Sequence, residues 1–237
     1  MPLLTLLAAA QVALTAPPPL RPGIAAFPRV VRPATPATRR INTALAALDT
    51  RVRTAAAACR REGGAGRSSW ERRVETTMRG PAFVSFLVTD DTYCGGAHPN
   101  NGHIAIVYDL ASGRPVDWAT LLPQALVGTQ ALTTGDDGVR VVTLASPRLT
   151  ALYRQGYRSG QDDAGVDEQC RDVIAADAEG GAIAFIAWLD GRRRGLMLQY
   201  DLPHAAQACS VPVLVPLTVL RREGASRRLL DALAVAR

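Results

Sequence analysis

The chain has 237 residues, of which 48% are hydrophobic and 20% charged, so it can bury a core and is not intrinsically disordered. Its net charge of +6 comes from arginine alone, because the sequence contains no lysine. The arginines lie in short scattered runs such as Arg192-Arg193-Arg194, without interleaved aromatic residues, and this pattern argues against a nucleic-acid-binding protein.

The first residues form an uncharged apolar run, 1–16, followed by Pro17-Pro18-Pro19. This run is similar to the apolar part of a secretory signal, and it is too short and alanine-rich for a membrane span. A disordered apolar tail is the alternative. Residues 17–36 hold much of the proline and show no periodicity, so we expect a linker or an extended lead-in there. We place the folded domain at residues 37–237.

The first long element is predicted to be a helix that begins at Thr35-Pro36, a capping residue followed by proline at the first helical position. Apolar residues then recur at spacings of three and four, as on one face of a helix. Gly63-Gly64 is expected to end it. The residues of this apolar face are Ile41, Leu45, Leu48, Val52, Ala56 and Cys59.

The remaining elements are mostly strands. From Ser69 the hydrophobic period changes to two, which indicates a half-buried strand. Further strands are expected at 83–88, 104–110, 139–144, 182–189, 195–200 and 213–220, and short helices after Asp117, Ser146 and Ser226. Residues 159–169 are polar and are expected to form a loop. Strands without βαβ alternation predict a single α+β domain with a mostly antiparallel sheet flanked by helices.

One segment is distinctive. Residues 93–102 read Tyr-Cys-Gly-Gly-Ala-His-Pro-Asn-Asn-Gly, and residues 107–113 read Val-Tyr-Asp-Leu-Ala-Ser-Gly. Together they resemble the signature of the extracytoplasmic domain shared by RsiV-type anti-sigma factors and PdaC-type peptidoglycan deacetylases. The helix bearing Ile41-Asn42 and the closing strands are similar to the same domain at the level of pattern. The resemblance covers roughly residues 27–222.

The resemblance implies an α+β extracytoplasmic domain from a family that is mostly uncharacterised. RsiV-like members bind a lysozyme outside the cell, and PdaC-like members carry their chemistry in a separate deacetylase domain. This chain departs from both patterns. It shows no sigma-binding segment, and Thr89-Asp90-Asp91 lacks the remainder of the deacetylase motif. The four cysteines are an addition that fits an oxidising compartment such as the periplasm.

The four cysteines, Cys59, Cys94, Cys170 and Cys209, form no Cys-x-x-Cys pair, so zinc-ribbon and thioredoxin-like sites are excluded. An even count behind an export-like segment favours two disulfides, and four cysteines allow three pairings. We predict Cys59–Cys94, which would join the first helix to the signature loop. We also predict Cys170–Cys209, which would join a helix-to-strand loop to the end of the closing hairpin.

The signature segment is the candidate ligand loop. Its glycines permit positive φ angles and its polar side chains offer hydrogen-bond donors and acceptors. A purely structural loop, tethered by Cys94 and with Asn101-Gly102 as a tight turn, is the alternative that the residue types favour. The residues of the candidate ligand loop are Gly95, Gly96, Ala97, His98, Pro99, Asn100 and Asn101.

Other chemistries find little support in the sequence. His98 and His103 are too few for a metal site, and nothing places His204 near them. The acidic pairs at 90–91, 136–137 and 162–163 are adjacent residues, which point to opposite faces of a strand and cannot flank one bond. We therefore expect no cofactor, no metal and no catalytic residues.

These observations favour an exported, periplasmic or secreted, non-enzymatic binding domain of the cell envelope. A lysozyme-like protein and a peptidoglycan-related glycan are the partners considered, and no nucleic acid is expected. Two alternatives remain. One is a cell-wall-modifying hydrolase or deacetylase-associated protein whose site the sequence does not reveal, and the other is a purely structural envelope domain.

Overall fold

The structure is a computed structural model, and it describes residues 11–64, 67–134, 140–159, 170, 172–174, 183–202 and 204–236. Residues 1–10, most of the signal-like run, lie outside this description, as does nearly all of the polar stretch 159–169. The strands are β1 (Leu14–Thr15), β2 (Arg29–Val30), β3 (Ser69–Arg79), β4 (Phe83–Tyr93), β5 (Asn100–Asp109), β6 (Thr129–Thr134), β7 (Arg140–Ala145), β8 (Ala184–Asp190), β9 (Gly195–Tyr200) and β10 (Val213–Pro216). The helices are α1 (Pro36–Gly63), η1 (Trp118–Thr120), α2 (Gln124–Val127), α3 (Pro147–Ser159), η2 (His204–Cys209), α6 (Leu217–Glu223) and α7 (Arg227–Val235).

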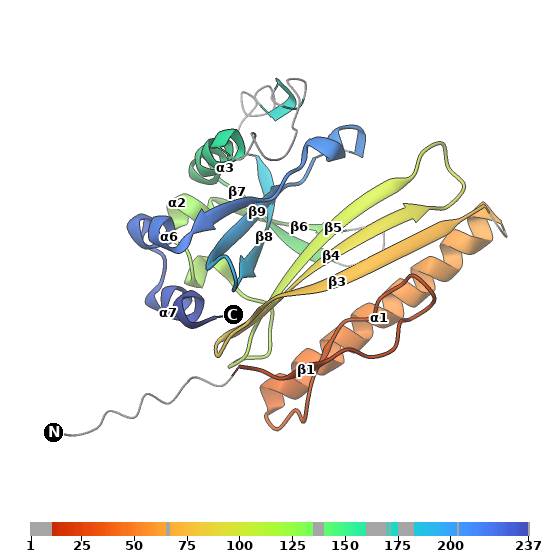
Figure 1. The fold of residues 1–237 in the computed structure, drawn as a ribbon, viewed down its shortest axis with the longest axis horizontal. Coiled ribbons are helices and arrows are strands. Elements are labelled where there is room, and N and C mark those ends of the chain that lie inside the picture. The colour runs from red at the N-terminus through yellow and green to blue at the C-terminus, as the bar shows by residue number, and fades with distance from the viewer. Residues whose placement is uncertain are drawn as a thin grey trace.

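The strands form three antiparallel sheets, and the predicted α+β class is confirmed. One sheet has the order β3-β4-β5, a second has the order β10-β9-β8-β7-β6, and β1 pairs with β2 alone. Helix α1 runs along the first sheet, whereas the shorter helices α2, α3, α6 and α7 gather around the second (Figure 1). The sheets meet at β8, which contacts all three strands of the first sheet.

Helix α1 forms where the sequence predicts it. Thr35 accepts a hydrogen bond from the backbone N–H of Thr38, and Thr38 returns one to Thr35 in a capping box. Ile41 and Leu45 of the apolar stripe are fully buried in one cluster with Phe86 and Ile106 on one face of the first sheet, and Leu48 is half-buried beside them. The long helix is thus fixed by its cap and by burial of this stripe.

The leading segment, residues 17–36, is part of the fold and not a free linker. Phe27 is fully buried beside Phe86, and Ile24 forms a parallel bridge to Arg72 at the edge of β3. Strand β1, at the end of the signal-like run, pairs with β2 inside this segment. The apolar core therefore includes residues that precede residue 37, where the sequence analysis places the start of the domain.

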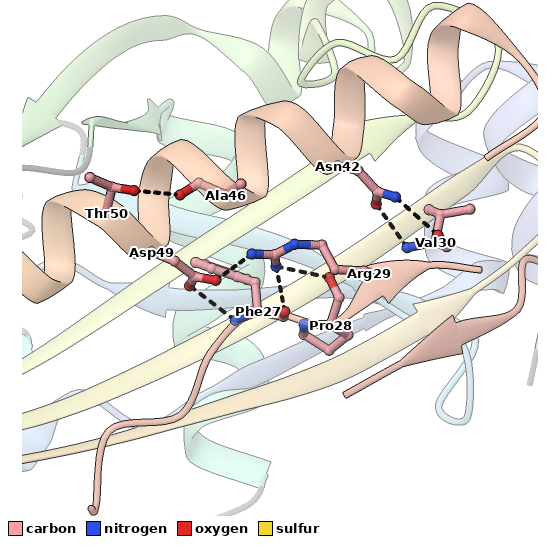
Figure 2. Close-up of polar contacts among 8 residues, drawn as sticks. All are labelled: Phe27, Pro28, Arg29, Val30, Asn42, Ala46, Asp49 and Thr50. Carbon is pink, nitrogen blue, oxygen red and sulfur yellow. Dashed lines mark hydrogen bonds and ion pairs between the residues drawn. The ribbon is translucent and has the colours of Figure 1, made fainter. Parts of the chain in front are cut away.

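Two polar residues of α1 dock this segment (Figure 2). Asn42 accepts a 2.8 Å bond from the Val30 N–H and donates a 3.0 Å bond to the Val30 carbonyl, so its amide replaces a strand partner. Asp49, which is 2% exposed, accepts bonds from the Phe27 N–H and the Arg29 guanidinium. The Ile41-Asn42 pair of the sequence pattern therefore has a physical role, with one residue in the core and the other on the leading segment.

Several boundaries differ from the predictions. Strand β4 continues to Tyr93 and β5 begins at Asn100, so this hairpin is longer than expected. The last strand ends at Pro216, where the chain turns into α6, although residues 213–220 were expected to be one strand. Proline has no N–H to continue the ladder, and the next N–H, of Leu217, bonds to the Arg194 carbonyl. Strand β6 and helix α2 were not predicted.

Candidate functional site

The signature segment links β4 to β5 at the end of a long hairpin. The two strands pair from Phe83–Asp109 to Thr92–Asn100, and the connecting loop lies near the last turns of α1 and the start of β3 (Figure 1). Asn101 and Gly102 belong to β5 and pair with Asp91 and Asp90. The tight turn expected at Asn101-Gly102 is therefore wrong, because the ladder extends past this pair and the chain turns over residues 94–99.

A disulfide fixes this loop to α1. Cys59 and Cys94 are bonded with a Cα–Cα distance of 4.7 Å, as predicted. Close backbone contact adds to the tether. Gly95 has φ +89°, and a Cβ at this position would lie 2.7 Å from the Cα of Gly63. A Cβ on Gly63 would in turn lie 2.9 Å from the carbonyl carbon of Cys94. Both glycines are required for the helix end and the loop to approach this closely.

Beyond this tether the loop faces solvent. All five residues from Gly95 to Pro99 are exposed, Asn100 is half-buried and Asn101 is exposed. No side chain of Gly95–Pro99 makes a hydrogen bond to another described residue, whereas Asn101 donates a 2.7 Å bond to the Asp91 carboxylate. The structure thus brings the predicted loop residues together as one exposed surface on a constrained backbone.

His103 and His98 lie in different environments. His103 is half-buried on β5, and its Nδ1 lies 3.3 Å from the amide nitrogen of Gln207 in η2. Desolvation by burial lowers the pKa of His103, and the Asp91 carboxylate opposes part of this shift. His98 is exposed in the loop. The two histidines therefore lie in different environments, one packed beside η2 and the other in the exposed loop.

The second predicted disulfide, Cys170–Cys209, is confirmed, with a Cα–Cα distance of 5.1 Å. It ties η2 to the helical residue Cys170. Gln207 of η2 contacts His103 of β5. This disulfide therefore also restrains the element that packs against the hairpin formed by β4 and β5.

The adjacent carboxylates Asp90 and Asp91 point to opposite faces of β4, as expected for neighbours in a strand. Asp90 is buried and accepts a 2.6 Å bond from Arg72 and a 2.7 Å bond from the Trp70 indole N–H. Asp91 faces outward. The other acidic pairs, 136–137 and 162–163, lie outside the described residues. Among the described residues there is no group of three or more His, Cys, Asp or Glu side chains that could hold a metal ion.

The buried Arg72–Asp90 pair was not predicted. Arg72 lies on the α1 side of β3 with a fully buried side chain, and its guanidinium lies 5.3 Å from the centre of the Phe27 ring. The alternation of β3 places Arg72 on the same face as Trp70, and that pattern was the only sign of its burial.

No helix of the described residues is long and apolar enough to span a membrane.

Comparison with known proteins adds two similar solved structures. No family model matches the chain, and no curated protein is significantly similar to it. A DUF3298 family member from Bacteroides fragilis is 17% identical, with a TM-score of 0.45 over 84% of this chain and 73% of that one. A DUF3298 family protein from Pseudomonas aeruginosa is 13% identical, with a TM-score of 0.40 over 68% of this chain and 64% of that one. At these values neither structure supplies an argument about the site, and the resemblance to RsiV- and PdaC-type domains stays a prediction.

Proposed function

We propose that this chain is an extracytoplasmic, non-enzymatic domain of the cell envelope that binds its partner through the loop Gly95–Asn101. One observation carries the proposal. The loop exposes five consecutive residues on a backbone that a disulfide and a glycine–glycine contact hold in place. Loops on a rigid scaffold are common recognition sites, because little conformational entropy is lost when they bind.

The location outside the cytoplasm is supported by the cysteines. Two disulfides persist in an oxidising compartment and are rare where thiols are kept reduced. The signal-like run at 1–16 points to the same compartment. The partner classes remain a lysozyme-like protein and a peptidoglycan-related glycan, the first of which the RsiV-like resemblance implies.

The test compares two alanines in exposed loops at opposite ends of β5. Ala97→Gln adds a neutral side chain to the signature loop, and Ala111→Gln adds the same side chain to the turn after β5. Binding to hen egg-white lysozyme is measured by surface plasmon resonance, and binding to purified peptidoglycan sacculi by co-sedimentation. We expect one of these ligands to bind, Ala97→Gln to lose that binding, and Ala111→Gln to retain it. Both variants should melt close to the parent protein.

Three results would contradict the proposal. Hydrolysis or deacetylation of sacculi by the purified protein would make it an enzyme of cell-wall metabolism. If Ala97→Gln binds as well as, or as poorly as, Ala111→Gln, the loop is not the specific site of recognition. Binding to neither ligand, together with a lower melting temperature for Ala97→Gln, would leave the signature with a structural role alone.

A further inference from the structure

A cavity of about 380 Å³ opens beside the last turns of α1, next to the disulfide that holds the signature loop. Cys59, bonded to Cys94, is part of its wall. Three segments form it, namely the leading segment around Arg21, the last turns of α1 around Arg60, and the start of β3. The start of β3 and the end of α1 lie at the same end of the molecule as the signature loop (Figure 1).

One wall of the cavity is apolar. The Trp70 ring is half-buried and packs with Ile24 and Ala56. Its only polar atom, the indole nitrogen, donates a 2.7 Å bond to the buried Asp90 carboxylate. The part of the indole left to the cavity is therefore apolar and is held rigidly by that bond. Such a surface suits the apolar face of a small ring.

The rim of the cavity is cationic. Among the described residues, neither the Arg21 nor the Arg60 guanidinium forms an ion pair or a side-chain hydrogen bond, whereas Arg29, Arg148 and Arg228 each pair with a carboxylate. The cavity holds one carboxylate, Glu71, whose nearest ion-pair partner is Arg73 at 3.9 Å. The hydroxyls of Ser68 and Ser69 add polar groups to the wall. The lining thus combines two unpaired cations with an aromatic surface and hydrogen-bonding groups.

We propose that this cavity binds a sugar that carries a carboxylate. The guanidinium groups of Arg21 and Arg60 would hold the carboxylate, since arginine donates paired hydrogen bonds that match its geometry. The sugar ring would lie against Trp70, and its hydroxyls would bond to Ser68, Ser69 and Glu71. A volume of about 380 Å³ lies at the low end for small-molecule sites, which fits one ring with its substituents. This inference rests on the proposed envelope-binding function and names a ligand class for the surface beside the loop.

The experiment uses two sugars that differ by the carboxylate. N-acetylmuramic acid carries a lactyl carboxylate that N-acetylglucosamine lacks, and lactate supplies the carboxylate without the ring. Binding is followed by tryptophan fluorescence, because Trp118 and Trp188 are 3% and 2% exposed and Trp70 is the accessible indole. We expect N-acetylmuramic acid to bind roughly tenfold or more tightly than either of the other two compounds, as for a charged hydrogen-bonded contact.

The matched variants are Arg60→Gln and Arg61→Gln. The two residues are adjacent and exposed in the last turn of α1 and carry the same charge, but only Arg60 lines the cavity. Arg60→Gln and Arg21→Gln should each weaken N-acetylmuramic acid binding by roughly tenfold or more, and Arg61→Gln should leave it unchanged within about twofold. All three variants should keep the melting temperature of the parent protein.

Equal binding of the two sugars, or equal effects of Arg60→Gln and Arg61→Gln, would overturn the carboxylate site. So would the absence of any fluorescence change at millimolar N-acetylmuramic acid. If the sugar does not bind but Ala97→Gln still abolishes binding to lysozyme or sacculi, this inference alone is wrong. If both tests are negative, the proposed function is wrong as well.

Discussion

The two main sheets of this molecule are stabilised in different ways. In the five-stranded sheet, β9 is buried along its whole length and β8 is buried except at its ends, and both pack in one large apolar cluster. The three-stranded sheet extends beyond its apolar core. Toward its hairpin end the buried residues include the Arg72–Asp90 pair, and nearer the middle of the sheet the buried Asp49 of α1 joins the leading segment. Where the apolar cover ends, buried charges and a disulfide replace it.

This difference follows from what covers each sheet. The second sheet is covered by amphipathic helices, whose apolar stripes need no polar partner. The first sheet is covered by α1 and by the leading segment, an extended segment without regular internal hydrogen bonds, so the backbone groups of that segment need partners from side chains. Asn42 and Asp49 supply them (Figure 2). A buried polar interaction of this kind specifies one docking position, and it is costly when one partner is lost.

The largest expected effect comes from the apolar centre of the first sheet's cover. Leu45 is fully buried on α1, and Leu45→Asp would place an unpaired charge there, at a cost of roughly 4 kcal/mol or more in unfolding free energy. Its neighbour Ala46 is exposed, so Ala46→Asp is the control and should change stability little. Urea unfolding followed by circular dichroism measures both variants. Similar stabilities would mean that α1 does not depend on this stripe.

The second prediction concerns the buried ion pair. Arg72→Met leaves the Asp90 carboxylate buried without its 2.6 Å cationic partner, which should cost about 3–5 kcal/mol. Arg73, the next residue, is 79% exposed, and Arg73→Met should be nearly neutral. The same unfolding measurement compares the two. A small loss for Arg72→Met would show that the outer end of the sheet depends on apolar contacts, as the second sheet does.

The third prediction sharpens the comparison through the two disulfides. They close loops of similar size, with sequence separations of 35 and 39, so Cys59→Ala/Cys94→Ala and Cys170→Ala/Cys209→Ala should each cost about 4 kcal/mol in the chain-entropy model. Their local effects should differ. Hydrogen exchange of residues 94–101 should speed up more in the first double variant, because of the two disulfides only Cys59–Cys94 is bonded to that loop. Equal acceleration in both would mean that the loop is positioned through the whole fold.

Much of this architecture could be predicted from local signals. The helices that begin after Thr35, Ser146 and Ser226 were predicted at these positions, and each of the three side chains accepts a bond from a backbone N–H only three residues away. The signature loop was also placed correctly, and both disulfides were paired correctly because each joins segments that the sequence pattern places close together.

What the sequence could not predict depends on contacts between distant residues. The docking of the leading segment needs Asn42 and Asp49, whose partners lie 12 to 22 residues away and carry no local signal. The β4-β5 hairpin is longer than predicted because its outer part is paired through polar residues such as Asp91 and Asn101. Polar residues show no hydrophobic period, so the sequence does not reveal this part of the strands. The cavity beside Cys59 arises only when three separate segments meet.

The smallest expected effect separates the two histidines at the signature hairpin. Burial lowers the pKa of His103 in the folded protein below the ordinary value of about 6.5 that it has in the unfolded chain. The unfolded chain then binds more protons as the pH falls, so this group removes stability below about pH 6.5, and the loss levels off below the folded pKa. We therefore expect His103→Gln to flatten the decline in unfolding free energy between about pH 7.5 and about pH 5. His98→Ala, in the exposed loop, should leave the melting temperature unchanged. A lower melting temperature for His98→Ala would mean that the loop histidine packs into the fold, and the loop could then no longer be treated as a free recognition surface.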